Sequence, residues 1–352
     1  MAATMKDIAK KTGLGLATVS SYFNGGNVRE KNRVKIEEAI RELDFEVNEV
    51  ARGLKTNTTR TIGVVIPELN NVFCSEIITA MEDVLRSHGY ATMICDCRTD
   101  RRLEREAVEF LMHRRVDGIV NMPVDTSGAH LESFLKSGRP VVLIDRKIRA
   151  LNCDCVFVDN LTAARNAISL LIQNGHRRIG IISGPEDVFT AQERLRGYRQ
   201  ILQESGIETE ERLICRGDYT MESGVRGLKA LVQENPDMTA VFATNYELTM
   251  GAVIGANELG LGIPEKLSMI GFDNLPFARA CHPKLTIVTQ PTEEIGRQAA
   301  EIMLERIREG VSVHREPTRF GENGSAETNS KWQPVFRKLQ TTIVEGSSVR
   351  RF

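Results

Sequence analysis

Residues 61–67 read TIGVVIP, a short apolar run rich in β-branched residues that ends at a proline. Such a run predicts a buried strand, because Val and Ile suit the pleated surface of a sheet and proline interrupts it. Residues before this run form short helical patterns without any strand-like run, whereas residues after it alternate between apolar runs and helical stretches. The run therefore marks the boundary between a helical head and a larger α/β core.

The alternation downstream predicts the architecture of the core. Apolar runs recur between helical stretches of 10–15 residues, a pattern typical of parallel sheets covered by helices on both faces. About ten such units are too many for one ordinary open sheet. We therefore expect two doubly wound parallel-sheet lobes, with a single (β/α)₈ barrel as the alternative. The clearest runs are ATMICD at 91–96, PVVLID at 140–145, RRIGIIS at 177–183 and LSMIGFD at 267–273.

Upstream, residues 4–24 read TMKDIAKKTGLGLATVSSYFN. The pattern predicts a helix from Met5 to Lys11, a tight turn at 12–14 and a second helix from near Leu16, with Ile8, Leu14 and Val19 packing the two together. This is the spacing of a helix-turn-helix, whose second helix enters the DNA major groove. An ordinary three-helix structural cap is the alternative. A third helix is predicted over about 30–43, with its apolar stripe formed largely by Val34, Ile36, Ala39, Ile40 and Leu43.

The charge distribution agrees with a nucleic-acid-binding head. Residues 1–36 carry 7 Lys and Arg against 2 Asp and Glu, and the remainder carries 39 against 45, although the whole chain has a net charge of only −1. A basic head on a mildly acidic body is expected when one segment contacts phosphate. Ordinary scatter of surface charge is the alternative explanation.

Composition excludes several classes of protein. With 352 residues, 41% hydrophobic and 26% charged, the chain is neither disordered, fibrous nor a small disulfide-stapled domain. It contains no run of about 18 apolar residues that could span a membrane. The N-terminus lacks the apolar segment of a secretory signal, and seven cysteines are an odd number for a disulfide framework. We therefore expect a cytoplasmic protein without a membrane partner.

Six motifs together resemble one family: TMKDIAKKTGLGLATVS, VNEVARGL, TIGVVIP, GHRRIGIISGP, RLRGY and IGFDN. In this order and spacing the chain resembles the LacI/GalR family of bacterial transcription regulators over almost its full length. The resemblance implies a DNA-binding head at 1–46, a hinge helix and linker at 47–59, and an effector-binding core at 60–352 related to periplasmic sugar-binding proteins. The expected N-lobe takes about 60–160 and 290–318, and the expected C-lobe takes about 161–289 and 319–352.

The resemblance also implies a homodimer that binds a pseudo-palindromic double-stranded DNA operator. Repression is the commoner mode in the family, so we expect a repressor whose operator affinity changes when an effector changes the closure of the two lobes. No leucine heptad follows the core, which favours a dimer over a tetramer. Two other classes remain open: a solute-binding protein for transport, and an α/β enzyme acting on sugars.

The candidate DNA-contacting residues lie in the head and the hinge. Leu16, Ala17, Ser20 and Ser21 are expected to face outward, and amides near a helix start can hold phosphate. In the family a leucine at the position of Leu54 wedges between base steps and kinks the duplex, whereas the residues alone favour a linker helix that docks on the core. The full set is Thr4, Leu16, Ala17, Thr18, Ser20, Ser21, Asn24, Arg52 and Leu54.

The head departs from the family pattern at three positions. Gly15, Ser21 and Val47 stand where the family usually has Ser, Arg and Pro. An arginine can read guanine through two hydrogen bonds, and serine cannot. The operator sequence is therefore not predictable by analogy.

Polar residues directly after apolar runs predict a ligand site in the core. Asp145, Asn245 and Asp273 follow three such runs, where parallel strands deliver side chains into a crevice. Each alone fits a turn or a helix cap equally well. The resemblance adds an effector-binding arginine and two aromatic positions, and Tyr246 stands where an aspartate is common. A sugar, sugar phosphate or nucleoside-like effector is expected. The candidate residues are Phe73, Asp145, Arg194, Tyr219, Asn245 and Asp273.

No residue pattern calls for a cofactor, a metal or a catalytic nucleophile. There is no Walker loop, no GxSxG and no GxGxxG after the first strand. The cysteine pairs 95/97 and 153/155 have strand spacing, so both members of a pair face one side, and buried thiols are expected rather than a zinc site. Residues 320–334, FGENGSAETNSKWQP, predict a long loop before a last strand at 339–346.

Overall fold

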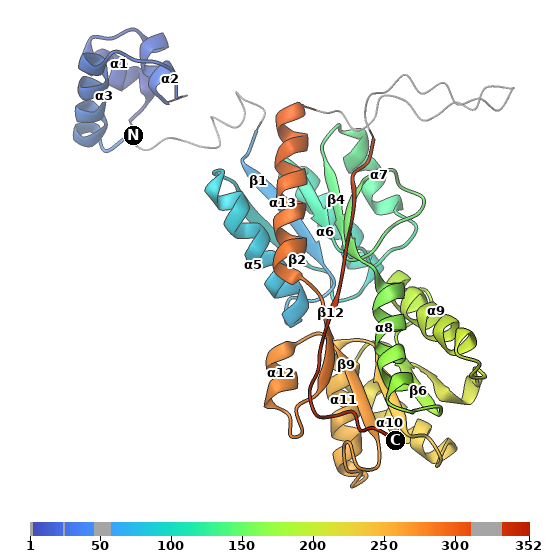
Figure 1. The fold of residues 1–352 in the computed structure, drawn as a ribbon. Coiled ribbons are helices and arrows are strands. Elements are labelled where there is room, and N and C mark those ends of the chain that lie inside the picture. The colour runs from blue at the N-terminus through green and yellow to red at the C-terminus, as the bar shows by residue number, and fades with distance from the viewer. Residues whose placement is uncertain (1–2, 24, 46–57, 311–332) are drawn as a thin grey trace, which may run out of the picture. The chain divides into compact units, whose positions relative to one another are not determined.

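The computed structural model describes residues 3–23, 25–45, 58–310 and 333–352, and the chain divides into two compact units, 1–59 and 60–352 (Figure 1). The first unit contains three helices, α1 (Met5–Thr12), α2 (Leu16–Phe23) and α3 (Glu30–Leu43). The Thr4 amide and hydroxyl both donate to Asp7 Oδ2, at 2.9 and 2.7 Å, which caps α1.

The helices of the first unit enclose a small apolar core. Ile8 and Val19 are fully buried and Leu14 packs against them, as predicted for the helix-turn-helix. The prediction was wrong for Val34, whose side chain is 44% exposed. Ile36 is buried two residues further on, and two residues correspond to about 200° around a helix, so both cannot face one core.

The second unit contains two six-stranded open sheets, which define an N-lobe and a C-lobe and exclude a (β/α)₈ barrel. The N-lobe strands are β1 (Thr61–Ile66), β2 (Ala91–Asp96), β3 (Gly118–Asn121), β4 (Val141–Ile144), β5 (Asp154–Val158) and β11 (Phe336–Leu339). The C-lobe strands are β6 (Ile179–Ser183), β7 (Ile214–Arg216), β8 (Ala240–Ala243), β9 (Ser268–Phe272), β10 (Thr286–Thr289) and β12 (Thr342–Val344).

Strand order identifies both sheets as doubly wound. The N-lobe order is β11-β5-β4-β3-β1-β2, with every pair parallel. The C-lobe order is β12-β10-β9-β8-β6-β7, in which only β10 and β12 are antiparallel. In each sheet the strand order reverses beside the first strand, and ligands bind at the carboxyl ends near such a reversal.

Helices cover both faces of each sheet, which explains why the central strands are continuous apolar runs. In the N-lobe, α5 (Val72–Ser87) and α13 (Thr292–Glu309) pack on one face, and α6 (Arg101–His113) and α7 (Ala129–Lys136) on the other. In the C-lobe the pairs are α8 (Asn160–Gln173) with α9 (Phe189–Glu204), and α10 (Met221–Glu234) with α11 (Tyr246–Glu258) and the short α12 (Leu275–Ala280). A 3₁₀ turn at Glu211–Leu213 precedes β7. Within the described ranges, no helix is both long and apolar enough to cross a membrane.

Within the described residues, the chain passes between the lobes after β5, after β10 and between β11 and β12. The expected placement of 319–352 in the C-lobe was wrong for residues 336–339, which pair with β5 in the N-lobe sheet. The error arose because the sequence predicted a loop over 320–334 and one last strand over 339–346, whereas residues 336–344 contain two short strands in different sheets.

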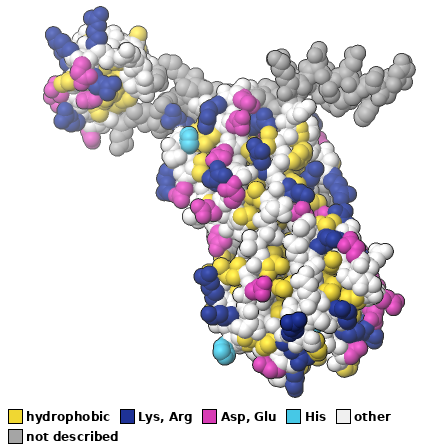
Figure 2. Space-filling model, viewed as in Figure 1, with side chains coloured by type: hydrophobic (Ala, Val, Ile, Leu, Met, Phe, Trp, Pro, Cys, Tyr) yellow, Lys and Arg dark blue, Asp and Glu magenta, His cyan; other side chains and the backbone are white. Residues whose placement is uncertain are grey.

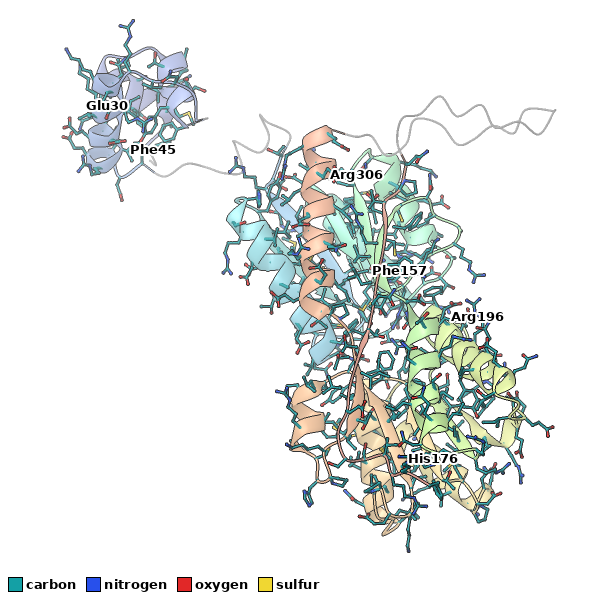
Figure 3. All side chains as sticks on the ribbon, viewed as in Figure 1. Glu30, Phe45, Phe157, His176, Arg196 and Arg306 are labelled. Carbon is teal, nitrogen blue, oxygen red and sulfur yellow. The ribbon has the colours of Figure 1, made fainter. Side chains whose placement is uncertain are left out.

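A buried ion pair fixes the strand that returns to the N-lobe. Arg306 of α13 (Figure 3) donates two hydrogen bonds of 2.8 Å to the Asp154 carboxylate and one of 2.9 Å to the Gln333 carbonyl. Asp154 Oδ1 also accepts the amide of Val335 at 2.7 Å. Because both charged groups are buried, each depends on the other to compensate for lost hydration. The pair therefore aligns the chain just before β11.

The two cysteine pairs pack in the N-lobe core under α6 and α7, with both members of each pair on one side as predicted. Cys97, Cys153 and Cys155 are buried there and Cys95 packs against the same cluster. Burial raises the pKa of Cys97 and of Cys153 to about 12, so these thiols stay protonated at neutral pH. In the part of the chain that the structure describes, no group of three or more His, Cys, Asp or Glu side chains could hold a metal ion.

Candidate functional site

The predicted DNA-contacting residues of the head gather around the start of α2. Leu16, with 46% of its side chain exposed, and Ala17 lie on the surface as predicted, and Thr4 is exposed at the start of α1. Ser20 and Ser21 are only partly exposed, and the Gly26 amide donates a 2.8 Å hydrogen bond to the Ser21 carbonyl. Thr18 is half-buried. Asn24, Arg52 and Leu54 lie outside the described residues.

Basic side chains lie along α1, the first helix of this pair. Lys6, Lys10 and Lys11 are exposed on α1, and lysines and arginines stand out on the surface of this unit in Figure 2. Lys11 forms an ion pair with Glu42 of α3. Exposed ammonium groups beside a helix whose first residues are on the surface can bind phosphate while the helix reaches into the groove.

In the core, all six predicted effector residues line one cavity of about 100 Å³ between the two lobes. Phe73 comes from the first turn of α5 and Asp145 from the residue after β4, both in the N-lobe. The other four come from the C-lobe: Arg194 from α9, Tyr219 before α10, Asn245 at the start of α11 and Asp273 after β9. The strand-end rule pointed to three of them, Asp145, Asn245 and Asp273, and the family resemblance supplied the other three.

Three of these residues have a backbone conformation that non-glycine residues rarely adopt. The φ angles of Asp145, Tyr219 and Asp273 are 64°, 67° and 63°. Left-handed backbone at a residue with a Cβ costs about 1–3 kcal/mol, and such residues cluster at ligand sites where the surrounding structure holds them in place. All three side chains line the cavity.

Arg194 is buried, with 3% of its surface exposed. Its Nε donates to Asn160 Oδ1 at 2.8 Å and a terminal nitrogen donates to the Thr244 carbonyl. The guanidinium lies 3.8 Å from the centre of the Phe272 ring, where the ring face attracts the cation. These contacts hold a buried positive charge at the wall of the cavity.

Two acidic residues, Asp273 and Asp145, line the same cavity as this cation. Burial raises the pKa of Asp273 to about 7, and the nearby Arg194 charge only partly offsets the effect. Gln290 Nε2 donates to both oxygens of Asp273, at 3.1 and 3.0 Å. Burial also raises the pKa of Asp145, whose Oδ2 lies 3.4 Å from Arg146 Nε. The cavity thus offers acceptors and donors side by side, which is what a polyhydroxylated ligand requires.

Asn245 is also a helix cap. Its Oδ1 accepts the Leu248 amide at 2.9 Å, so α11 is capped although Tyr246 has replaced the aspartate common in the family. Its Nδ2 donates to the Tyr219 carbonyl at 3.4 Å, which ties two loops of the cavity together. Asn245 is therefore a helix cap, which was the alternative explanation from sequence, and it also lines the cavity.

Among the other residues that line the cavity are Arg146, Thr190 and Gln290, which the sequence analysis did not single out. Gln290 follows the apolar run LTIVT, so the strand-end rule applies to it as well and would have found it. Thr190 Oγ1 lies 3.3 Å from Tyr219 Oη. Its position on α9 carries no comparable signal, because only the packing of α9 turns it toward the cavity.

Comparison with known proteins assigns the family. Residues 4–48 match the family model described as bacterial regulatory proteins of the lacI family, and residues 59–327 match periplasmic binding proteins and the sugar binding domain of the LacI family. The chain belongs to the LacI family. Its members are transcriptional regulators and not enzymes, so this LacI-family chain is a DNA-binding transcription regulator.

Individual relatives cover nearly the whole chain. The HTH-type transcriptional repressor CytR of Escherichia coli K12 is 36% identical over 312 residues, 87% of this chain and 90% of CytR. Catabolite control protein A of Priestia megaterium is 33% identical over 305 residues, 86% of this chain and 92% of that protein. The transcriptional regulator CelR in complex with cellobiose superposes with a TM-score of 0.71 at 29% identity, covering 98% of this chain and 99% of CelR. The lac repressor dimer bound to operator shares the fold, with a TM-score of 0.83 at 22% identity.

Proposed function

We propose that this LacI-family regulator is a repressor that binds a pseudo-palindromic operator as a homodimer and responds to a sugar, sugar phosphate or nucleoside-like effector in the interlobe cavity. The main support for an effector site in this cavity is that six predicted residues, from both lobes, line it together. The relatives CytR and catabolite control protein A support repression and control of metabolism. A regulator of bacterial transcription acts in the cytoplasm.

The effector acts by contacting both lobes at once. Asp145 belongs to the N-lobe, and Arg194 and Asp273 belong to the C-lobe, so a ligand that bridges them stabilises one degree of closure over others. Contacts at the lobe boundary move with that closure: Arg101 of α6 pairs with Asp187 of the C-lobe, and the rings of Phe157 and Phe189 are 6.4 Å apart. Figure 3 places Phe157 near the junction of the lobes. The hinge segment that includes Leu54 transmits the change to the DNA-binding heads.

The DNA role is tested by selecting bound duplexes from a random pool with the full-length chain, with and without candidate sugars and nucleosides. We expect enrichment of a two-fold symmetric sequence whose affinity changes with one of these compounds. Sedimentation of the chain with that duplex gives the stoichiometry, for which we expect two chains per site. Failure to enrich any sequence at moderate ionic strength would refute the proposal.

A further inference from the structure

The C-lobe contains a cavity of about 390 Å³ beside α9, which we call the α9 cavity. It is lined by the loop that follows β6, by one face of α9 and by Arg216 at the end of β7, so every lining residue belongs to the C-lobe. Figure 1 shows α9 at the margin of that lobe. Cavities that hold small molecules usually measure about 300–1,000 Å³. The α9 cavity is therefore large enough for a ligand of its own, separate from an effector between the lobes.

Arginine supplies most of the charge in this cavity. Arg196, Arg199 and Arg216 line it, whereas Glu186 is the one acidic residue among the described residues that do so. The exposed fractions of the three arginine side chains are 53%, 42% and 36%, so a ligand can reach all three. The remaining polar lining residues are Ser183, Gln192, Gln200 and Gln203. Because a guanidinium group only donates hydrogen bonds, donors predominate, and the cavity suits a ligand rich in acceptors.

Two of these arginines converge on one carboxylate. A terminal nitrogen of Arg199 donates to Glu211 Oε1 at 2.5 Å, and one of Arg216 donates to Glu211 Oε2 at 3.3 Å. Arg199 lies on α9, Arg216 ends β7 and Glu211 starts the 3₁₀ turn before β7, so three separate elements meet there. Within the described residues neither arginine forms another hydrogen bond, so each keeps donors for a ligand. The two guanidinium groups are therefore already arranged to hold one oxyanion.

Glu211 is held weakly enough to be displaced. Its side chain is 65% exposed, and exposed ion pairs contribute little to stability because water competes with them. A phosphate group carries more charge than a carboxylate, offers three acceptor oxygens and binds arginine through two parallel hydrogen bonds. Arg196 (Figure 3), one turn earlier on α9 than Arg199, pairs with Glu193 at 2.7 Å and lines the same cavity. It adds a third positive charge for a ligand that fills the cavity.

The helix that lines this cavity also contributes to the cavity between the lobes. Thr190 and Arg194 of α9 line the interlobe cavity, and Pro185, just before α9, lines both cavities. A ligand in the α9 cavity thus contacts the same helix and the same loop as an effector does. Its position is suited to modifying the response to the effector.

We propose that the α9 cavity is a binding site for a small molecule that carries a phosphate group. Arg199 and Arg216 bind the phosphate, and Glu211 is the internal competitor that occupies them in the absence of ligand. The inference goes beyond the proposed function, because it adds a second ligand site in the C-lobe and does not depend on which effector binds between the lobes.

The test is isothermal titration calorimetry of the full-length chain with glycerol 3-phosphate at low, constant ionic strength, with glycerol as the uncharged counterpart. Neither compound has the ring expected of the effector, so binding at the two sites is not confused. We expect glycerol 3-phosphate to bind with a Kd of about 1 mM or tighter, and glycerol to give no measurable binding.

Three variants test the assigned residues. Arg199→Gln and Arg216→Gln are each expected to weaken binding of glycerol 3-phosphate about tenfold, because each removes charge-assisted hydrogen bonds to the phosphate. Glu211→Gln is expected to tighten binding about threefold, because the competing carboxylate is replaced by a neutral amide. Circular dichroism spectra show whether each variant keeps the fold.

Arg212→Gln is the matched control. Arg212 follows Glu211 in the chain, its side chain is 54% exposed and pairs with Glu210, and it does not line the α9 cavity. This variant removes the same charge as the other two arginine variants, so a general effect of net charge would appear in it as well. We expect its affinity for glycerol 3-phosphate to change less than about twofold.

Three results would overturn the inference: no binding of glycerol 3-phosphate above that of glycerol, equal affinities in Arg199→Gln, Arg216→Gln and Arg212→Gln, or weaker binding in Glu211→Gln than in the wild type. None of these would affect the proposed DNA role, which the duplex selection measures independently. Conversely, a chain that binds glycerol 3-phosphate as expected but enriches no duplex would retain the α9 site and lose the proposed function.

Discussion

Replacing Asp273 by asparagine is expected to stabilise the core, and to do so more strongly as the pH rises. Burial raises the pKa of the Asp273 carboxyl from 3.8 to about 7. Between these two pH values the folded chain keeps a proton that the unfolded chain releases, so the stability of the wild type falls as pH increases through this window. Asparagine has no such proton, and its amide can donate to the unpaired Gln290 Oε1.

The magnitude follows from the width of the window. Each pH unit between the two pKa values corresponds to about 1.4 kcal/mol. Between pH 5 and pH 8 the wild type therefore loses about 3 kcal/mol relative to Asp273→Asn, nearly all of it below pH 7. For a domain of this size that difference amounts to a change in relative melting temperature on the order of 6 °C.

Differential scanning calorimetry of ligand-free wild type and Asp273→Asn at pH 5, 6, 7 and 8 measures this difference directly. Effects of titrating groups that do not interact with Asp273 cancel in the comparison. Glu208→Gln, the same chemical change at an exposed position, controls for the loss of one surface carboxylate and is expected to show no such trend. A stabilisation by Asp273→Asn that stays constant or shrinks as pH rises would contradict the reasoning.

Three further predictions concern the two sites and the returning strand. Arg194→Met leaves Asn160 Oδ1 and the Thr244 carbonyl without their donor, and we expect loss of effector binding by calorimetry with the circular dichroism spectrum of the fold retained; a normal isotherm would overturn the role of Arg194. Leu54→Ala is expected to weaken operator binding about tenfold in a filter-binding or anisotropy titration without changing effector affinity, because unstacking a base step needs the wedge; equal operator affinity would refute the wedge. Arg306→Met leaves the buried Asp154 carboxylate unpaired, and we expect a loss of about 3–5 kcal/mol in urea unfolding, whereas the double replacement with Asp154→Leu should recover much of it. If the double variant were no more stable than Arg306→Met, the loss would not come from the unpaired charge.

Much of the local structure could be predicted because it depends on neighbours in the chain. The helix-turn-helix follows from the burial of Ile8 and Val19 at helical spacing, and the strands follow from apolar runs. The predictions were wrong where the spacing of apolar residues does not determine which side chains are buried or which sheet a strand joins. Val34 was placed in the core although it lies on the opposite side of α3 from Ile36, and the last segment was read as one strand although it contributes to both sheets.

The ligand site also contains some residues that the sequence could predict and others that it could not. The rule that polar residues after buried strands gather at one edge of a sheet identified Asp145 and Asp273, and it applies equally to Gln290. Thr190 carries no comparable signal in sequence, because its position in the cavity depends on how α9 packs. A second cavity, of about 260 Å³, was also unforeseen, since its walls come from segments that are distant in the chain.

By itself, the sequence determined the helical head, the alternating α/β core and the residues at the carboxyl ends of the strands, because periodicity and turn chemistry act over a few residues. Only the tertiary structure decided that β11 completes the N-lobe sheet, that Gln290 pairs with Asp273, and that a second cavity opens beside Tyr246. These features depend on which surfaces of the two lobes and their crossings face each other. No local pattern encodes that choice, because it is made by packing the entire core at once.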